Sequence, residues 1–312
     1  MNLKELPIRH ASQTILVMSL TILSALSTSR AGFSQKIGRS DNAKTKFHSA
    51  ARVDSRFIQV HPLPTDQTSL IRSSGQARAI ILIHGLQIHP VSNLEVLKAT
   101  FRSWQMADSK LVNTLASEAD VFAFAYSENV PLERIVSESL LKVEIGNLKD
   151  LGYTQIVLIG HSAGGLIARE FVEDYPDCGV TKVIQVCAPN AGTSVAHLES
   201  GVRTYQRPFL HCLTKEGRAV CLQERAEKRI PPSIQLVCVI ADGMGSGDFL
   251  ISNTSQWPKD LQDQGIPAVA LHTNHFAIMH SKTQAQKIAE IVRNDMPRWN
   301  EVQVISMKKS LK

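Results

Sequence analysis

The sequence predicts an α/β protein with a mostly parallel sheet of about six strands, helices on both faces of the sheet, and a cap or lid insertion. Two observations lead to this fold class. Between residues 77 and 300, short runs of continuously apolar residues recur, and longer segments with helical periodicity separate them. Continuous apolarity is what a strand buried on both faces requires. Strands that alternate with helices are joined by right-handed crossovers and therefore run parallel.

The elements are expected in a regular order along the chain. A polar lead-in covers residues 32–76 and contains a short edge strand at 56–60. Core strands are then expected at 79–83, 121–125, 156–159, 183–187, 236–240 and 268–271. Helices with apolar residues three and four positions apart are expected at 111–119, 131–148, 166–173 and 282–296. No repeat or long linker interrupts the series, so we expect one domain over 77–300, followed by a C-terminal tail at 301–312.

The segment 191–233 breaks this alternation, because it is polar and too long for an ordinary crossover connection. We interpret it as a cap or lid over the site; the alternative is a surface excursion with no role in binding. Cys212 and Cys221 lie nine residues apart within it and are candidates for a loop-closing disulfide. Cys187 and Cys238 lie in apolar runs and are expected to be buried thiols.

Residues 1–31 have the pattern of a signal peptide. Lys4 and Arg9 supply a positive start, an apolar run follows at 14–26, and small residues then suit cleavage before Thr28 or Gly32. The apolar run is short for a bilayer span, which needs about 20 residues. We therefore expect a secreted or periplasmic protein, the alternative being a membrane anchor that is not cleaved.

Charge and spacing exclude some classes of partner. The net charge is +6, but it is not concentrated on a basic run or in a nucleic-acid-binding module, so we expect no nucleic-acid partner. A mildly cationic surface is compatible with peripheral contact to a membrane or the cell envelope. Neither Cys-x-x-Cys nor His-x-x-x-His spacing occurs, and no metal site is expected. The oligomeric state is not predicted.

The pentapeptide Gly160-His161-Ser162-Ala163-Gly164 fits the Gly-x-Ser-x-Gly pattern of a nucleophile turn. Such a turn joins a strand to a helix and thrusts the serine hydroxyl into the open, at a backbone so crowded that side chains beside it would collide. Here the pattern follows a core strand and begins a helix. Ser162 is therefore the expected nucleophile, and His161 fills the variable position of the turn.

From residue 79 to 281 the chain resembles the lipase and esterase branch of the α/β-hydrolase superfamily, particularly bacterial triacylglycerol lipases. The resemblance rests on Ile-His-Gly-Leu at 83–86, the nucleophile turn, Ala-Pro-Asn-Ala-Gly-Thr at 188–193, and the segments that follow the last two core strands. In such lipases the third of these places usually reads Pro-His-x-Gly, and Asn190 stands here in place of the His. The resemblance implies an α/β-hydrolase fold with the chain order serine, acid, histidine.

The same resemblance selects an acid and a base. Asp242 and Asp248 both follow the fifth core strand, and the lipase pattern favours Asp248, although Asp242 lies immediately beyond the strand. Three histidines follow the last strand. His275 matches the lipase segment in which the base precedes an apolar stretch and the final helix, whereas His272 and His280 are expected to have structural or surface roles.

These residues imply acyl transfer through a covalent intermediate, with no metal or organic cofactor. The backbone N–H groups of Leu86 and Ala163 are the expected oxyanion donors, and His84 is expected to be structural. The substrate class is a small-molecule or lipid ester, and the polar 191–233 segment favours smaller or more polar esters. An amidase, thioesterase or acyltransferase on the same triad is the main alternative, and a secreted binding protein without catalysis is another.

Overall fold

The computed structural model describes residues 52–64, 69–87, 94–194, 204–243, 245 and 247–311, all within one compact unit. The expected signal peptide and the lead-in up to residue 51 lie outside the described residues. Seven strands form one sheet: β1 (Ser55–His61), β2 (Arg78–Ile83), β3 (Asp120–Tyr126), β4 (Gln155–His161), β5 (Val180–Val186), β6 (Gln235–Ala241) and β7 (Ala268–Leu271).

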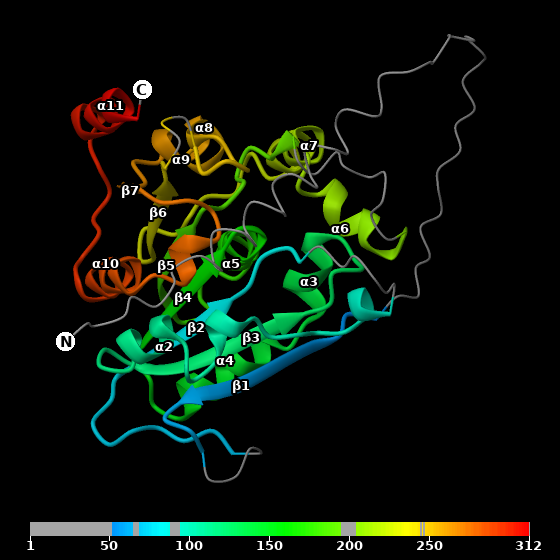
Figure 1. Ribbon diagram of the computed structural model, residues 1–312, viewed down its shortest axis with the longest axis vertical. Coiled ribbons are helices and arrows are strands. Elements are labelled where there is room, and N and C mark those ends of the chain that lie inside the picture. Colours follow the sequence, from blue (N-terminus) through cyan, green and yellow to red (C-terminus); the bar gives the residue numbers. More distant parts are fainter. Residues whose placement is uncertain are drawn as a thin grey trace, which may run out of the picture. The chain divides into compact units, whose positions relative to one another are not determined.

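The strands are arranged in the order β1-β3-β2-β4-β5-β6-β7 (Figure 1). Every neighbouring pair is parallel except β1 and β3, which are antiparallel. The mostly parallel sheet predicted from the apolar runs is confirmed, and β1 is the expected edge strand. Because the other six strands are parallel, the loops that leave β2, β4, β6 and β7 all begin at the same edge of the sheet.

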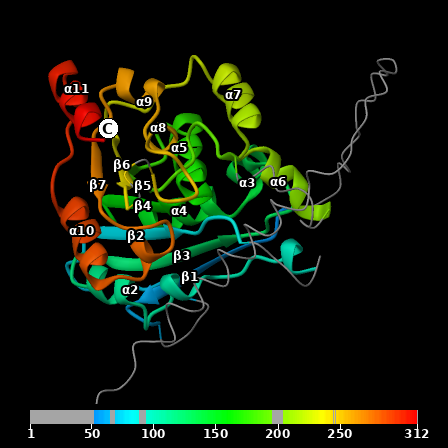
Figure 2. The ribbon, with the colours of Figure 1, turned by 45° about the horizontal axis from the view of Figure 1, so that its top comes forward.

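Alternate residues of a central strand contribute to two separate cores. Ala79, Ile81 and Ile83 of β2 belong to one core, and Ile80 and Leu82 to the other. Helices α3 (Leu132–Glu138), α4 (Leu141–Asp150) and α5 (Ala163–Asp174) cover the first face, and α2 (Lys110–Leu115) and α10 (Lys282–Arg293) the second (Figure 2). This two-sided burial is the reason that the strands are continuously apolar.

The helix expected at 131–148 is two helices, α3 and α4. The backbone between them is extended at Ser139, with φ −82° and ψ 171°. The hydroxyl of Ser139 accepts a hydrogen bond from the N–H of Leu141, and the hydroxyl of Ser55 on β1 accepts one from the N–H of Leu140. Serine hydroxyls that bond nearby backbone groups compete with the helical pattern, which explains the break.

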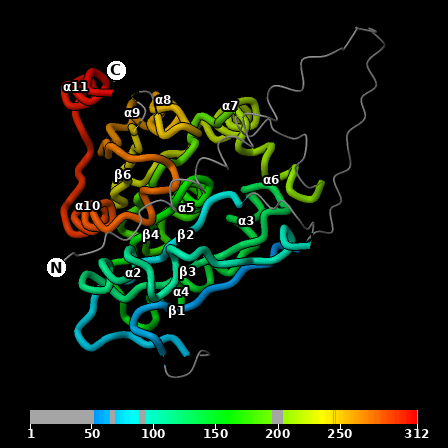
Figure 3. The backbone as a smooth tube through the Cα atoms, viewed as in Figure 1, coloured from blue at the N-terminus to red at the C-terminus, as the bar shows by residue number. Residues whose placement is uncertain are grey.

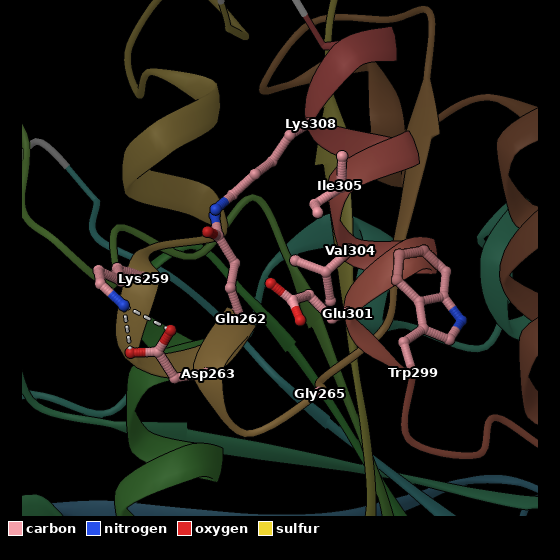
Figure 4. A pocket seen from close by; sticks show the side chains of 9 residues that line it. All are labelled: Lys259, Gln262, Asp263, Gly265, Trp299, Glu301, Val304, Ile305 and Lys308. Carbon is pink, nitrogen blue, oxygen red and sulfur yellow. Dashed lines mark hydrogen bonds and ion pairs between the residues drawn. The ribbon is translucent and has the colours of Figure 1, made fainter.

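The segment 301–312 was expected as a tail, but it begins with helix α11 (Glu301–Ser310), which Figure 3 traces after α10. Asn300 and Gln303 form a reciprocal capping box at its start, and Val304 is buried in the first core. A hollow of about 410 Å³ between α9 (Lys259–Asp263) and α11 is lined by nine residues of these helices and the loops beside them (Figure 4). The buried Val304 packs α11 against the rest of the unit.

The 191–233 insertion connects β5 to β6. Its described part contains the short helices η4 (Thr204–Gln206), α6 (Arg207–His211) and α7 (Lys215–Glu224). Other short helices are η1 (Glu95–Leu97), η2 (Ser103–Gln105), α8 (Asn253–Gln256) and η5 (Ala277–Met279). Among the described residues, no helix combines the length and the apolar character that crossing a membrane requires.

The disulfide expected between Cys212 and Cys221 is absent, and both thiols are free. Cys212 directly follows α6, and its sulfur contacts the carbonyl oxygen of Pro208 at 3.4 Å. Cys221 belongs to α7, and its sulfur lies 3.3 Å from the Arg218 guanidinium and 3.5 Å from the Glu170 carboxylate. The thiols therefore have separate partners on separate helices, which a spacing of nine residues does not reveal. Cys187 and Cys238 are buried, as expected.

Candidate active site

The candidate residues follow four of the parallel strands, β2, β4, β6 and β7. Ser162 follows β4, Asp248 lies in the segment after β6, His275 follows β7, and Gly85 lies just beyond β2. The carboxyl ends of parallel strands share one edge of a sheet, which is where open α/β sheets hold their ligands. Residues that are far apart in the sequence are therefore brought to the same edge of the sheet.

Ser162 occupies a strained turn between β4 and α5. Its φ of 53° and ψ of −124° lie in a region that residues with a side chain rarely adopt. Its N–H donates to the carbonyl of Val186 at the end of β5, at 2.8 Å, and this bond holds the turn in place. A Cβ added to Gly160 would lie 2.3 Å from the Gly164 oxygen, and one added to Gly164 would lie 2.4 Å from the Ile83 oxygen. The expected crowding around the serine is confirmed.

His275 and Asp248 form a buried pair. The Nδ1 atom of His275 lies 2.5 Å from Oδ2 of Asp248, and the His275 N–H donates to the Asp248 carbonyl at 3.3 Å. The other carboxylate oxygen accepts from the N–H groups of Leu250 at 2.9 Å and Ile251 at 2.7 Å. Burial favours the neutral acid, but the hydrogen bond from His275 and these N–H donors outweigh it, and the Asp248 pKa is lowered.

The other candidates for acid and base lie apart from this pair. The Asp242 carboxylate accepts from the side-chain amide of Asn253 at 3.1 Å, and its backbone carbonyl lies 3.2 Å from Nδ1 of His272. His272 and His280 are exposed. The geometry thus favours Asp248 over Asp242 as the partner of His275.

His161 does more than fill the variable position of the turn. Its side chain is buried, and Nε2 lies 2.9 Å from the backbone carbonyl of His275, with the two ring centroids 4.7 Å apart. Burial lowers the pKa of His161 to about 3, so the ring is neutral and Nε2 carries the proton that it donates. His275 is thereby held from two sides, by Asp248 and by His161. The only sequence signal for this contact is the imidazole directly before the nucleophile.

The loop after β2 lies against the nucleophile. A Cβ added to Gly85 would lie only 2.5 Å from the Cβ of Ser162, so the next residue, Leu86, also begins close to it. Among the described residues, the backbone N–H groups of Leu86 and Ala163 and the hydroxyl of Ser162 make no hydrogen bond. Unsatisfied donors beside a serine hydroxyl are what an oxyanion site requires.

One group of candidate metal ligands occurs among the described residues. Side-chain ligand atoms of His161, Cys187 and His275 lie within 4.8 Å of one another. Both imidazoles already make hydrogen bonds within the site, and the fully buried Cys187 thiol lies beside Asp248, with its pKa raised mainly by burial. Of these contacts, the one with Asp248 orients the His275 ring, and the one with His161 holds its backbone carbonyl.

The chain has the α/β-hydrolase fold, as the resemblance implied. Its structure is similar to that of the lipase BlEst2 from Bacillus licheniformis in its mature form, with a TM-score of 0.55, 12% identity, and coverage of 76% of this chain and 98% of that one. The propeptide form of that lipase also gives a TM-score of 0.55 and 12% identity, covering 79% of this chain and 55% of that one. No family model and no curated protein sequence matches the chain.

Proposed function

We propose that the protein is a serine hydrolase that cleaves carboxylic esters. The observation that carries the proposal is the buried His275–Asp248 pair at the sheet edge where the strained turn presents Ser162. A serine hydroxyl is a poor nucleophile unless a base takes its proton, and the base needs a carboxylate to hold its tautomer and to stabilise its cation. The folds of the matched lipases agree with this function but do not by themselves define it.

In the proposed mechanism the Ser162 oxygen attacks the ester carbonyl while His275 removes its proton. The oxyanion that forms is bound by the N–H groups of Leu86 and Ala163. The tetrahedral intermediate collapses, His275 gives its proton to the departing alcohol, and the acyl group remains on Ser162. Water then gives a proton to His275, attacks the acyl carbonyl and releases the acid. Atoms and charges balance without a cofactor.

The proposed substrates are small or fairly polar esters. Of the ten residues of α7, which belongs to the insertion, only Arg218 is buried, and neither α6 nor α7 offers a long apolar face. Export from the cytoplasm remains part of the proposal, based on residues 1–31.

The test is hydrolysis of p-nitrophenyl esters from acetate to palmitate. We expect the parent protein to be active, with an optimum at short chains. Ser162→Ala and Asp248→Asn are expected to lower kcat by roughly 10⁴-fold. Asp242→Asn is the matched control and should keep kcat within about twofold, because the carboxylate of Asp242 bonds only Asn253 among the described residues.

Two results would count against the proposal. Loss of activity in Asp242→Asn but not in Asp248→Asn would reverse the acid assignment. A parent that hydrolyses no ester and whose Ser162 is not labelled by a fluorophosphonate would exclude a serine hydrolase. Labelling without ester hydrolysis would point to amides or thioesters as substrates.

A further inference from the structure

A buried carboxylate holds the loop that follows β2. Glu128 lies two residues beyond β3 with its side chain only 2% exposed, and both of its carboxylate oxygens lie 3.0 Å from the N–H of Gln87. The Arg102 guanidinium lies 2.7 Å from the same carboxylate and supplies its countercharge. The backbone N–H of Gln87, the residue after Leu86, is therefore held by a side chain that follows β3.

The insertion between β5 and β6 holds the same residue from another direction. Gln206, the last residue of η4, is 1% exposed. Its Nε2 lies 2.6 Å from the carbonyl oxygen of Gln87 and 2.6 Å from Oε2 of Glu128. An amide nitrogen has two protons, so one side chain can donate to both acceptors. The backbone N–H and C=O of Gln87 are therefore held by Glu128 and Gln206.

The preceding peptide is held by His84. The Tyr126 N–H lies 3.3 Å from Nε2 of His84, which makes that nitrogen the acceptor and leaves the proton on Nδ1. Nδ1 lies 2.8 Å from the Gly85 carbonyl oxygen, to which it can donate. In a trans peptide the C=O of one residue and the N–H of the next point in opposite directions. Holding the Gly85 oxygen therefore aims the Leu86 N–H away from His84.

We propose that Gln206 is a positioning residue of the oxyanion site: by joining Gln87 to Glu128, it makes the insertion part of the device that aims the Leu86 N–H. This inference rests on the proposed function. Its consequence is that the docked position of η4 affects the chemical step and not only access of the substrate. If Gln206 only attached the insertion, changes to it would alter stability or KM but leave kcat unchanged.

The experiment compares Gln206→Met with Gln223→Met, using p-nitrophenyl acetate. Methionine keeps the length of glutamine and removes both donors. Gln223 lies exposed on α7, in the same insertion, and its side chain makes no hydrogen bond among the described residues. We expect Gln206→Met to lower kcat by about 10- to 100-fold, less than the full loss of an oxyanion donor, with KM within about twofold. Gln223→Met should match the parent. Gln206→Asn, whose amide is one methylene too short, should also lower kcat, and it replaces the methionine variant if that one does not fold.

Hydrogen exchange of the backbone supplies a second readout. Peptides covering residues 84–87 should exchange faster in Gln206→Met than in the parent or in Gln223→Met, because the Gln87 carbonyl loses its donor and the loop opens more readily. An active parent with equal kcat in the Gln206 and Gln223 variants would overturn the inference alone. Faster exchange with unchanged kcat would also overturn it, by making Gln206 purely structural. A parent without ester hydrolysis or fluorophosphonate labelling would defeat the proposed function, and this inference with it.

Discussion

His161 illustrates how one side chain can serve both the turn and the base. It belongs to the nucleophile turn by sequence and to the His275 loop by contact, since its Nε2 lies 2.9 Å from the His275 carbonyl. A buried neutral imidazole is a stable donor, because no protonation change within the physiological range disturbs it.

We therefore expect His161→Phe to lower kcat by about tenfold and to leave KM unchanged. The phenyl ring keeps the contacts with His275 and Trp104 but cannot donate to the His275 carbonyl, and one such bond contributes about 1 kcal/mol. Steady-state kinetics on p-nitrophenyl acetate measures the effect. His280→Phe is the control at an exposed position, and equal kcat in both variants would show that His161 does not orient the base.

Replacing glycine by alanine is expected to have opposite effects at two positions, Gly85 and Gly146. In Gly85→Ala the new methyl group would meet the Ser162 Cβ at 2.5 Å, so the loop or the nucleophile must shift, and we expect kcat to fall by about 100-fold. Gly146 lies in α4, and a Cβ there meets nothing within 4 Å. Gly146→Ala should raise the free energy of unfolding by about 0.5–1 kcal/mol and leave activity unchanged. Kinetics and urea unfolding of both variants test this pair, and an active Gly85→Ala would contradict the close approach.

At the scale of elements, α7 is attached to the nucleophile helix α5 through charge. Arg218 of α7 and Glu170 of α5 are buried, and their charged atoms lie 2.6 Å apart. Arg225, which directly follows α7, also pairs with Glu173 of α5 at 2.9 Å. The sequence offered only scattered charges here, since the partners are about 50 residues apart.

Removing one member of the buried pair should be costly. Arg218→Met leaves the Glu170 carboxylate without its charged partner, and we expect a loss of about 3–5 kcal/mol in the free energy of unfolding. Adding Glu170→Gln should restore part of that loss, because the unpaired charge is gone. Lys259→Met, which breaks an exposed pair with Asp263, should change stability by less than about 0.5 kcal/mol. The free energy of unfolding is measured in urea. If Arg218→Met and Lys259→Met lose similar amounts of it, this account of the α5–α7 contact is refuted.

The same helices determine the state of the thiols. Because Cys212 and Cys221 have separate partners, alkylation of the protein unfolded without reductant should modify all five cysteines. Mass spectrometry measures the number of modified thiols. The thermal midpoint should also be the same with and without dithiothreitol. A mass that shows only three modified cysteines would mean that two of the five form a disulfide, and would contradict this account.

At the scale of the whole molecule, Glu128 links pH to stability. Burial raises its pKa to about 7, although Arg102 and the donors Gln87 and Gln206 oppose the shift. The folded protein therefore binds a proton between about pH 4.5 and 7 that the unfolded chain releases, and its stability falls as pH rises through this window. A guanidinium and a phenol ordinarily titrate well above this window, and burial raises the pKa of Tyr126 further, so neither Arg102 nor Tyr126 accounts for the change.

We expect Glu128→Gln to remove this pH dependence. For a shift from 4.5 to about 7 the difference amounts to about 3 kcal/mol between pH 4.5 and pH 8. The measurement is urea unfolding of the parent and the variant at several pH values. His161 contributes with the opposite sign, since its lowered pKa makes stability fall as pH drops from 6.5 toward 3, and it is common to both proteins. Parallel curves would mean that Glu128 keeps an ordinary pKa.

The features that could be predicted from the sequence are those encoded in a short continuous stretch of residues. The six core strands lie within a few residues of their expected positions, because each is marked by its own continuous run of four or five residues, nearly all of them apolar. The break at Ser139 and the helix α11 were missed, since they depend on a single hydroxyl and on a capping box. The disulfide predicted between Cys212 and Cys221 was wrong, because the spacing of two cysteines in the sequence does not show where their side chains point.

The sequence by itself determined the α/β class, the order of the strands along the chain and the Gly-x-Ser-x-Gly turn, because each is encoded in a continuous stretch of residues. Only the tertiary structure decided that His275 bonds Asp248 and not Asp242, that His161 holds His275, and that Gln206 reaches Gln87. The partners in these contacts lie between 27 and 119 residues apart. Crossovers of a parallel sheet bring such segments to one edge, and which side chains meet there depends on loop geometry that no local pattern contains.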